Sequence, residues 1–410
     1  MAHAKQLDLS RDVIRLDDGA ATRAALLAGV GLAAIVLGLF FGGRSGWDVF
    51  FRSYLLNWSF AFTIVMGALF FVMLQHLTRA GWSVSVRRLA EFVMGTMPLM
   101  AILFVPMLIP VIVGMEGVYK WSSAAVVEKD PLLQHKAAYL STPFFIIRML
   151  VYFGLWIFLA RYFLGRSLEQ DRTGDPQLTL AMDRTSAWAM LAYAISFTFF
   201  SIDALMSLNP HWFSTIFGVY IFSGSVVGFF ATLALIVVAV QRSGRLTHAI
   251  SVEHFHDIGK LMFGFIVFWA YIKFSQYMLI WYANLPEETV WYLPRQGDTW
   301  WIGVSLLLLF GHFVAPFLAL LSRFPKRRPW LLTLGAAWML LMHWVDLYYI
   351  VIPRPHGFGP AVAPLHATDV LLLVGMACLL VAGILWQMRG RPLVPERDPR
   401  LHESLSFENI

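Results

Sequence analysis

Charge and cysteine are both scarce in this sequence. Charged residues make up 14% of the 410 residues and hydrophobic residues 59%, whereas soluble proteins carry about 25% charge. The single cysteine, Cys378, excludes an intrachain disulfide, a cysteine ligand set for an iron–sulfur cluster and a C-x-x-C-H haem attachment. No P-loop, nucleophile elbow or Rossmann glycine pattern occurs either. These absences argue against a soluble enzyme and against a cysteine-bound redox centre within this chain.

Long apolar runs fill most of the chain instead. About 20 helical residues cross a hydrocarbon core roughly 30 Å thick, and backbone groups in lipid must be satisfied within the segment. We therefore predict an all-α polytopic membrane protein with a tail at 1–23, a membrane domain at 24–388 and a second tail at 389–410. Its ten predicted spans are 24–43, 54–77, 89–113, 143–165, 186–207, 215–241, 257–282, 299–321, 329–351 and 367–388.

The basic residues predict the orientation of these spans. Of the 31 lysines and arginines, 21 fall on the side of the two termini and seven on the other side. An excess of basic residues in short loops marks the cytoplasmic side, so we expect both termini in the cytoplasm. The net charge of +6 then reflects topology and gives no argument for nucleic-acid binding. Six tryptophans at the outer ends of spans are expected to act as interface anchors: Trp47, Trp121, Trp212, Trp291, Trp300 and Trp301.

Four ionisable residues are predicted to share one layer in the outer third of the membrane. A helical rise of about 1.5 Å per residue puts Arg148, Asp203 and Asp346 at about 26 Å from the cytoplasmic face and Lys273 at about 24 Å. Isolated charges at this depth are costly, so opposite charges should pair. The pairs are either static contacts between helices or part of a proton-transfer or ligand site.

Further polar residues outline a hypothetical proton path across the membrane. Span five carries a stripe of hydroxyls, and Glu91, His254 and His256 stand near the cytoplasmic mouth, where a solvated interfacial turn is the competing interpretation. His312 and His343 differ in depth by about 7 Å, which disfavours a shared haem iron, and no metal-binding motif lies within a span. The candidate proton-transfer residues are Glu91, Arg148, Tyr193, Ser196, Ser201, Asp203, His254, His256, Lys273, His312, His343 and Asp346.

Prolines and loops add two structural expectations. Pro98, Pro106 and Pro110 predict a kinked third span, which either shapes a cavity or serves packing alone. The outer segments 114–142 and 284–301 mix aromatic and charged residues. They are expected to cap the helices or to dock an external partner.

The run FFSIDALMSLNPHWFSTIFGVYIFSGS at 199–225, together with FWAYIKFSQYMLIWYANLP at 268–286, resembles the NrfD-like (PsrC-like) membrane subunits of quinone-linked oxidoreductases. It is most similar to those of alternative complex III, and in particular to the smaller, ActF-type subunit. The resemblance implies two four-helix bundles, spans two to five and six to nine, with spans one and ten flanking them. Asp203 matches the family motif, but Ala204 stands where the larger paralogue has phenylalanine.

The resemblance also implies partners and cofactors. The expected partners are a larger NrfD-like paralogue, an iron–sulfur subunit, multihaem cytochrome c subunits, small membrane subunits and phospholipid. Haem c and iron–sulfur clusters would belong to those partners, none would be bound directly by this chain, and a quinone remains a candidate ligand. The resemblance implies a bacterial inner membrane, and we expect a non-catalytic or auxiliary subunit of a quinol:electron-acceptor oxidoreductase that supports assembly and proton translocation. The alternatives are a quinone-binding subunit, a purely structural scaffold and a solitary secondary transporter.

Overall fold

The computed structural model describes residues 9–353 and 365–409, without the side chain of Arg11. The described residues are mainly helical, with one isolated bridge between Val13 and Arg245 and no strand. Ten segments are long and apolar enough to cross a bilayer, as the sequence predicted. They are α1 (Ala20–Ser45), α2 (Trp47–Leu77), a third span over Val84–Ile112, α8 (Thr142–Thr173), α9 with η4 (Gln177–Leu208), α10 (Phe217–Arg242), α11 (Val252–Ala283), an eighth span over Thr299–Leu321, α17 (Pro329–Val351) and α18 (Ala367–Met388).

Several helices continue beyond the predicted hydrocarbon segments. The fourth span runs on to Thr173 and the fifth begins at Gln177, so each covers 32 residues. At about 1.5 Å per residue such a helix is roughly 48 Å long, comparable to a bilayer of about 40–45 Å with its headgroup regions. Hydropathy detects the apolar part of a helix and misses its polar ends.

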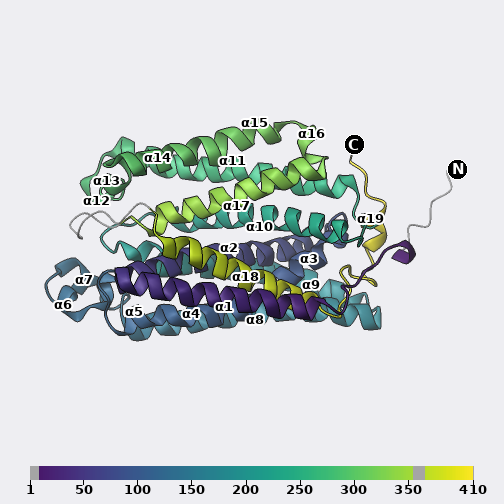
Figure 1. The fold of residues 1–410 in the computed structure, drawn as a ribbon, viewed down its shortest axis with the longest axis horizontal. Helices are drawn as coiled ribbons and strands as arrows, with labels where there is room; N and C mark the ends of the chain where they lie inside the picture. The colour runs from purple at the N-terminus through teal and green to yellow at the C-terminus, as the bar shows by residue number, and fades with distance from the viewer. Residues whose placement is uncertain (1–8, 354–364, 410) are drawn as a thin grey trace.

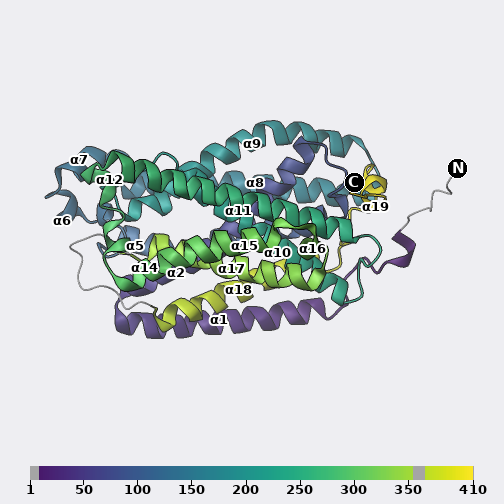
Figure 2. The ribbon, with the colours of Figure 1, turned by 90° about the horizontal axis from the view of Figure 1, so that it is seen from above.

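The spans form two four-helix bundles with a flanking pair, as expected. The first bundle holds α2, the third span, α8 and α9; the second holds α10, α11, the eighth span and α17. The two bundles meet along α2 and α10, which are buried over most of their length. Figure 1 shows α14 and α15 on one side of the molecule and α4 and α8 on the other, and Figure 2 shows α1 at one edge and α9 at the opposite edge.

Short helices lie at the two ends of the bundles (Figure 1). At one end, here the loop end, are η3 (Lys120–Ser122), α6 (Ala124–Val127), α7 (Pro131–Lys136), α12 (Pro286–Thr289) and α13 (Leu293–Gln296). The opposite tail end carries η1 (Leu9–Arg11), α16 (Arg323–Lys326) and α19 (Leu401–Leu405). Both described chain tails therefore lie at the same end, and its cytoplasmic location stays a prediction from charge.

The third and eighth spans are broken where the sequence places prolines. The third consists of α3 (Val84–Met94), α4 (Met97–Phe104), η2 (Val105–Met107) and α5 (Leu108–Ile112). The eighth consists of α14 (Thr299–Leu307), a π-helical turn η5 (Leu308–Val314) and α15 (Ala315–Leu321). Pro316 lies just after the π turn and cannot donate a backbone hydrogen bond, which helps to explain the wider turn before it.

The outer segments cap the loop end. Arg52 donates to the carbonyl of Gly117 at 2.7 Å, and Lys136 donates to that of Pro210 at 2.7 Å. The tryptophan prediction is wrong for Trp121, Trp212, Trp291 and Trp301, which are buried in the protein. Because these caps fold back over the helices, the rings pack within the chain; only Trp47 and Trp300 remain largely exposed.

Candidate functional site

The predicted layer of charges resolves into two separate ion pairs, one in each bundle. Arg148 on α8 binds Asp203 on α9, with Nε–Oδ2 at 2.8 Å and Nη2–Oδ1 at 3.1 Å. Lys273 on α11 binds Asp346 on α17, with Nζ–Oδ1 at 2.8 Å. Among the described residues no hydrogen bond joins one pair to the other. The prediction of pairing is confirmed, and the two pairs have different surroundings.

The first-bundle pair is saturated with partners. The Tyr152 hydroxyl donates to Asp203 Oδ2 at 3.0 Å, and Arg148 Nη1 donates to the carbonyl of Tyr139 at 2.9 Å. The guanidinium also lies over the rings of Tyr139 and Phe144, at 4.0 and 4.4 Å from their centroids. A bidentate, fully bonded pair of this kind is a rigid cross-link between two helices.

The predicted hydroxyl stripe of α9 is also occupied by local bonds. Ser196 donates to the carbonyl of Tyr193 and accepts the indole N–H of Trp156 at 3.0 Å. Ser201 donates to the carbonyl of Phe197 at 2.7 Å, and the Tyr193 hydroxyl donates to that of Met66 at 3.2 Å. These hydroxyls mainly satisfy helix carbonyls.

The second-bundle pair lies in a cluster of aromatic and ionisable side chains from four helical segments. Besides Lys273, the carboxylate of Asp346 accepts the Trp269 indole N–H at 2.8 Å and the Tyr220 hydroxyl. Lys273 Nζ also lies 4.5 Å from the ring centroid of Tyr349. We call Tyr220, Trp269, Lys273, His312, His343 and Asp346 the α11–α17 cluster.

His312 is buried in this cluster without a hydrogen bond. Its ring stacks on Trp269 with centroids 3.6 Å apart, and it lies within electrostatic range of Asp346 and Lys273. Neither ring nitrogen bonds to a described protein group. The π turn η5 carries this histidine, and such turns are frequent at functional sites.

His343 connects the cluster to the first bundle. Its Nε2 lies 2.8 Å from Thr63 Oγ1 on α2, while its Nδ1 has no described partner. α10 packs closely against the ring: a Cβ placed on Gly228 would meet His343 Cδ2 at 2.8 Å, and one on Gly224 would meet the ring at 3.3 Å. Glycine at 228 is therefore required for the observed position of this imidazole.

The tail end holds a buried charge network that the sequence analysis largely missed. Arg87 and Arg88 on α3 form ion pairs with Glu91 at 3.4 and 2.9 Å. Arg88 also binds Asp171 at 2.7 Å, and Arg87 binds Asp398 of the C-terminal tail. The count of basic residues in loops treated these two arginines as solvated, but both are at most 1% exposed. Their spacing to Glu91, three and four residues, was the signal that could have revealed them.

The C-terminal tail extends this network across the tail end. The backbone N–H of Glu396 donates to Asp171 Oδ1 at 3.0 Å, and Arg400 donates to Asp183 at 3.0 Å. Burial alone would raise the pKa of Asp398, but Arg87 and a backbone hydrogen bond from Arg400 hold that pKa below its usual range. We call residues 389–409 the tail clasp.

Of the two histidines predicted at the cytoplasmic mouth, His254 contacts the tail clasp. His254 Nδ1 accepts the backbone N–H of Ser251 at 3.1 Å, capping α11, and its Nε2 lies 3.1 Å from Ser404 Oγ. His256 is half-buried and its Nδ1 has no described partner. No direct hydrogen bond among the described residues joins Glu91 to these histidines, but Ser404 links His254 to Ser85 on α3, the helix that carries Glu91.

Arg295 stands at the loop end without a carboxylate partner among the described residues. It donates to the carbonyls of Tyr349 and Ile350 at 3.0 Å each and of Trp291 at 2.6 Å. The bonds to Tyr349 and Ile350 satisfy two of the last carbonyls of α17, where the helix dipole also favours a cation. Burial lowers the pKa of Arg295 to about 10.

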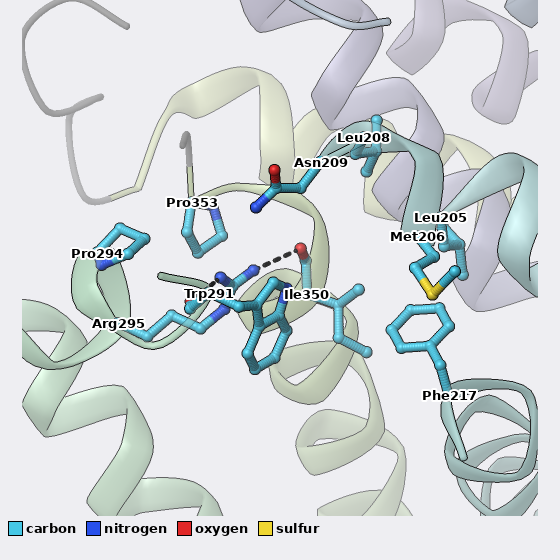
Figure 3. A pocket seen from close by; sticks show the side chains of 10 residues that line it. All are labelled: Leu205, Met206, Leu208, Asn209, Phe217, Trp291, Pro294, Arg295, Ile350 and Pro353. Atoms are coloured by element: carbon cyan, nitrogen blue, oxygen red, sulfur yellow. Dashed lines mark hydrogen bonds between the residues drawn. The ribbon is translucent and has the colours of Figure 1, made fainter. Parts of the chain in front are cut away.

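A hollow lies beside Arg295 between the two bundles (Figure 3). Its cavity volume is about 20 Å³, room for about one water molecule, and apart from Asn209 and Arg295 its lining residues are apolar or aromatic. The guanidinium points to the Ile350 carbonyl, so its donors are already engaged by the protein (Figure 3). The hollow therefore offers few free donors for the carbonyl oxygens of a quinone.

The described residues contain no group of three or more histidine, cysteine or acidic side chains suited to hold a metal ion. Cys378 is the single cysteine and lies within α18. These residues do not fit a haem c or an iron–sulfur cluster. No family model matches this chain, and no curated protein matches it.

Proposed function

We propose that this chain is an integral-membrane subunit of a quinol:electron-acceptor oxidoreductase, and that its α11–α17 cluster transfers protons. The resemblance at 199–225 supports the assignment to a quinol-oxidising complex. The ten-span architecture with two bundles agrees with that resemblance. Electron transfer is assigned to partner subunits, because this chain offers no cysteine ligand set for a cluster or haem c.

One observation carries the proton-transfer part of the proposal. Three buried imidazole nitrogens, two on His312 and one on His343, have no described hydrogen-bond partner and lie beside the Lys273–Asp346 pair. A buried polar atom without a partner is costly, so a purely structural cluster would not favour it. An imidazole can accept a proton at one nitrogen and release one from the other.

The cluster extends toward the loop end. Gln276 lies one turn from Lys273 on α11 and is buried, and its Oε1 accepts the Ser214 hydroxyl at 3.1 Å. In the other direction the rings of Phe263, Phe313 and Phe317 pack together. We therefore assign proton exchange to the loop end: a proton released by quinol oxidation in the complex is taken up by His312 and leaves past Lys273 and Gln276.

The first-bundle pair has a structural function in this proposal. Arg148 and Asp203 have all their strong hydrogen bonds within the protein, and their side chains are 8% and 0% exposed. A carboxylate held by two hydrogen bonds from a guanidinium fixes the relative position of the two helices that carry the pair. This assignment moves the functional centre from the predicted joint layer to the second bundle alone.

The test uses the native complex reconstituted in vesicles, with quinol turnover and proton release measured together. Lys273→Met and His312→Phe should each reduce the protons released per quinol, because each removes an exchangeable group from the cluster. Glu169→Gln, at an exposed ion pair on α8, is the control and should behave like wild type. Wild-type proton release in both cluster variants would overturn the proton-transfer assignment, and absence of a quinol-oxidising activity from the purified complex would overturn the subunit assignment.

A further inference from the structure

An apolar groove opens on the membrane face between α1, α4 and α18. Ala25 and Ala28 of α1 form one wall, Pro98 and Leu99 of α4 form another, and Leu379–Gln387 of α18 lies between them. The groove encloses about 390 Å³, within the roughly 300–1,000 Å³ of sites that bind small molecules. Its position on the outside of the bundle makes it accessible from the lipid.

The floor of the groove depends on two close helix contacts. A Cβ on Gly383 would meet Leu99 at 2.9 Å and Thr96 at 3.1 Å. The side-chain amide of Gln387 donates to the carbonyl of Gly95 at 2.9 Å, at the break between α3 and α4. The groove is thus a fixed feature of the packing of α18 on the broken third span.

Two arginines stand at the tail-end mouth of the groove. The Arg389 guanidinium lies 5.3 Å from the ring centroid of Trp386, a groove-lining residue that is 58% exposed. Arg391 donates to Gln387, to its Oε1 at 2.7 Å and to its carbonyl at 3.1 Å. No ion pair joins either arginine to a carboxylate in the described parts of the chain.

The electrostatic surroundings of Arg391 favour an added anion. Burial and the nearby charge of Arg88 lower the pKa of Arg391. Both effects oppose the charged form of this guanidinium, and a negative group at the mouth would offset them. The mouth lies at the end of the apolar span α18, where a membrane helix of this length is expected to reach the lipid headgroups.

We propose that this groove binds one anionic phospholipid, with an acyl chain between α1, α4 and α18 and the phosphate at Arg389 and Arg391. The lining of α18 from 379 to 387 covers about 12 Å along the helix axis, most of the roughly 15 Å depth of one hydrocarbon leaflet. A neighbouring protein helix would fill the apolar groove equally well, but it would need an acidic residue at its end to match the two arginines. The phospholipid supplies both parts in one molecule, and the inference does not depend on the proposed function.

Trp386 provides the readout for the test. The full chain is reconstituted in phosphatidylcholine vesicles to which a brominated lipid is added. The brominated lipid is either phosphatidylglycerol or phosphatidylcholine, and its brominated acyl chains quench tryptophan fluorescence. The fluorescence of Trp386 is obtained as the difference between the fluorescence of wild type and that of Trp386→Phe. We expect brominated phosphatidylglycerol to quench this fluorescence at lower mole fraction than brominated phosphatidylcholine, by roughly fivefold for each arginine.

Three variants complete the experiment. Arg389→Gln should remove part of the preference, and Ala25→Phe, which fills the groove from an exposed position on α1, should weaken quenching by both lipids. Arg242→Gln, at the tail end but on α10, should keep the wild-type preference. Equal quenching by the two lipids in wild type would overturn the anionic assignment. Absence of quenching of Trp386 by either lipid would overturn lipid binding and would leave a protein helix as the occupant.

Discussion

Asp203→Asn tests the structural assignment of the first bundle. The substitution keeps the shape of the side chain but removes the negative charge that Arg148 binds at 2.8 and 3.1 Å. Arg148 then keeps the Tyr139 carbonyl, two aromatic rings and a neutral amide oxygen in place of the carboxylate. Removing one partner of a buried ion pair costs about 3 to 5 kcal/mol, because the other charge stays buried.

This cost can be measured as a loss of thermal stability. Unfolding entropies of about 2.1 cal/mol/K per residue correspond to roughly 0.9 kcal/mol/K for a chain of 410 residues. The midpoint of thermal unfolding in detergent should therefore fall by roughly 3 to 6 °C. Circular dichroism of the helix signal follows the transition directly.

An exposed ion pair on the same helix gives the matched control. Arg166 and Glu169 on α8 are 3.1 Å apart with side chains 43% and 41% exposed. Glu169→Gln should change the free energy of unfolding by less than about 1 kcal/mol. If Asp203→Asn is as stable as this control, the saturated pair is not a structural cross-link and the assignment of the first bundle fails.

Three further predictions concern the cluster and the tail clasp. Gly228→Ala should displace His343 and cost roughly 1 to 3 kcal/mol of unfolding free energy, whereas Gly264→Ala, where a Cβ meets nothing within 4 Å, should not destabilise in the same thermal assay. Thr63→Val should change the histidine C–H chemical shifts of His343 in NMR spectra, because it removes the 2.8 Å contact to Nε2; unchanged shifts would contradict the observed contact. The pKa of Asp398 is lowered in the folded protein, so its carboxylate stabilises the tail clasp fully above the unfolded-state pKa of about 3.9. This stabilisation is lost as the pH falls through the lower pKa of the folded state. Backbone hydrogen exchange in residues 389–409, corrected for intrinsic rates, should therefore rise only at acidic pH in wild type. In Asp398→Asn it should already be faster at neutral pH. Equal protection of the two proteins at neutral pH would refute the clasp.

The sequence alone predicted the ten spans, because hydropathy is a one-dimensional property, and the depth of each ionisable residue stays a prediction from helical rise. It predicted a common layer for Arg148, Asp203, Lys273 and Asp346, and it could not assign their partners. Partner choice depends on which helix faces which, and that is set by packing: Arg148 and Asp203 lie on neighbouring spans, whereas Lys273 reaches from span seven to span nine.

The tail-end network was hidden for a related reason. Arg87 and Arg88 look like ordinary cytoplasmic charges in the sequence, and Asp398 lies more than 300 positions away in a polar tail. Contacts with α8 and with the tail clasp bury these charges. The π turn that carries His312 was equally invisible, since Pro316 predicts a disturbance but not its geometry.

The most direct test of the central claim compares two isosteric substitutions in the native complex. Asp346→Asn and Asp203→Asn each remove one buried carboxylate charge, one from the α11–α17 cluster and one from the saturated pair of the first bundle. Protons released per quinol oxidised are measured in vesicles for both variants at matched amounts of assembled complex. We predict that the ratio falls in Asp346→Asn and stays at the wild-type value in Asp203→Asn; the reverse pattern, or a wild-type ratio in both, would contradict the account.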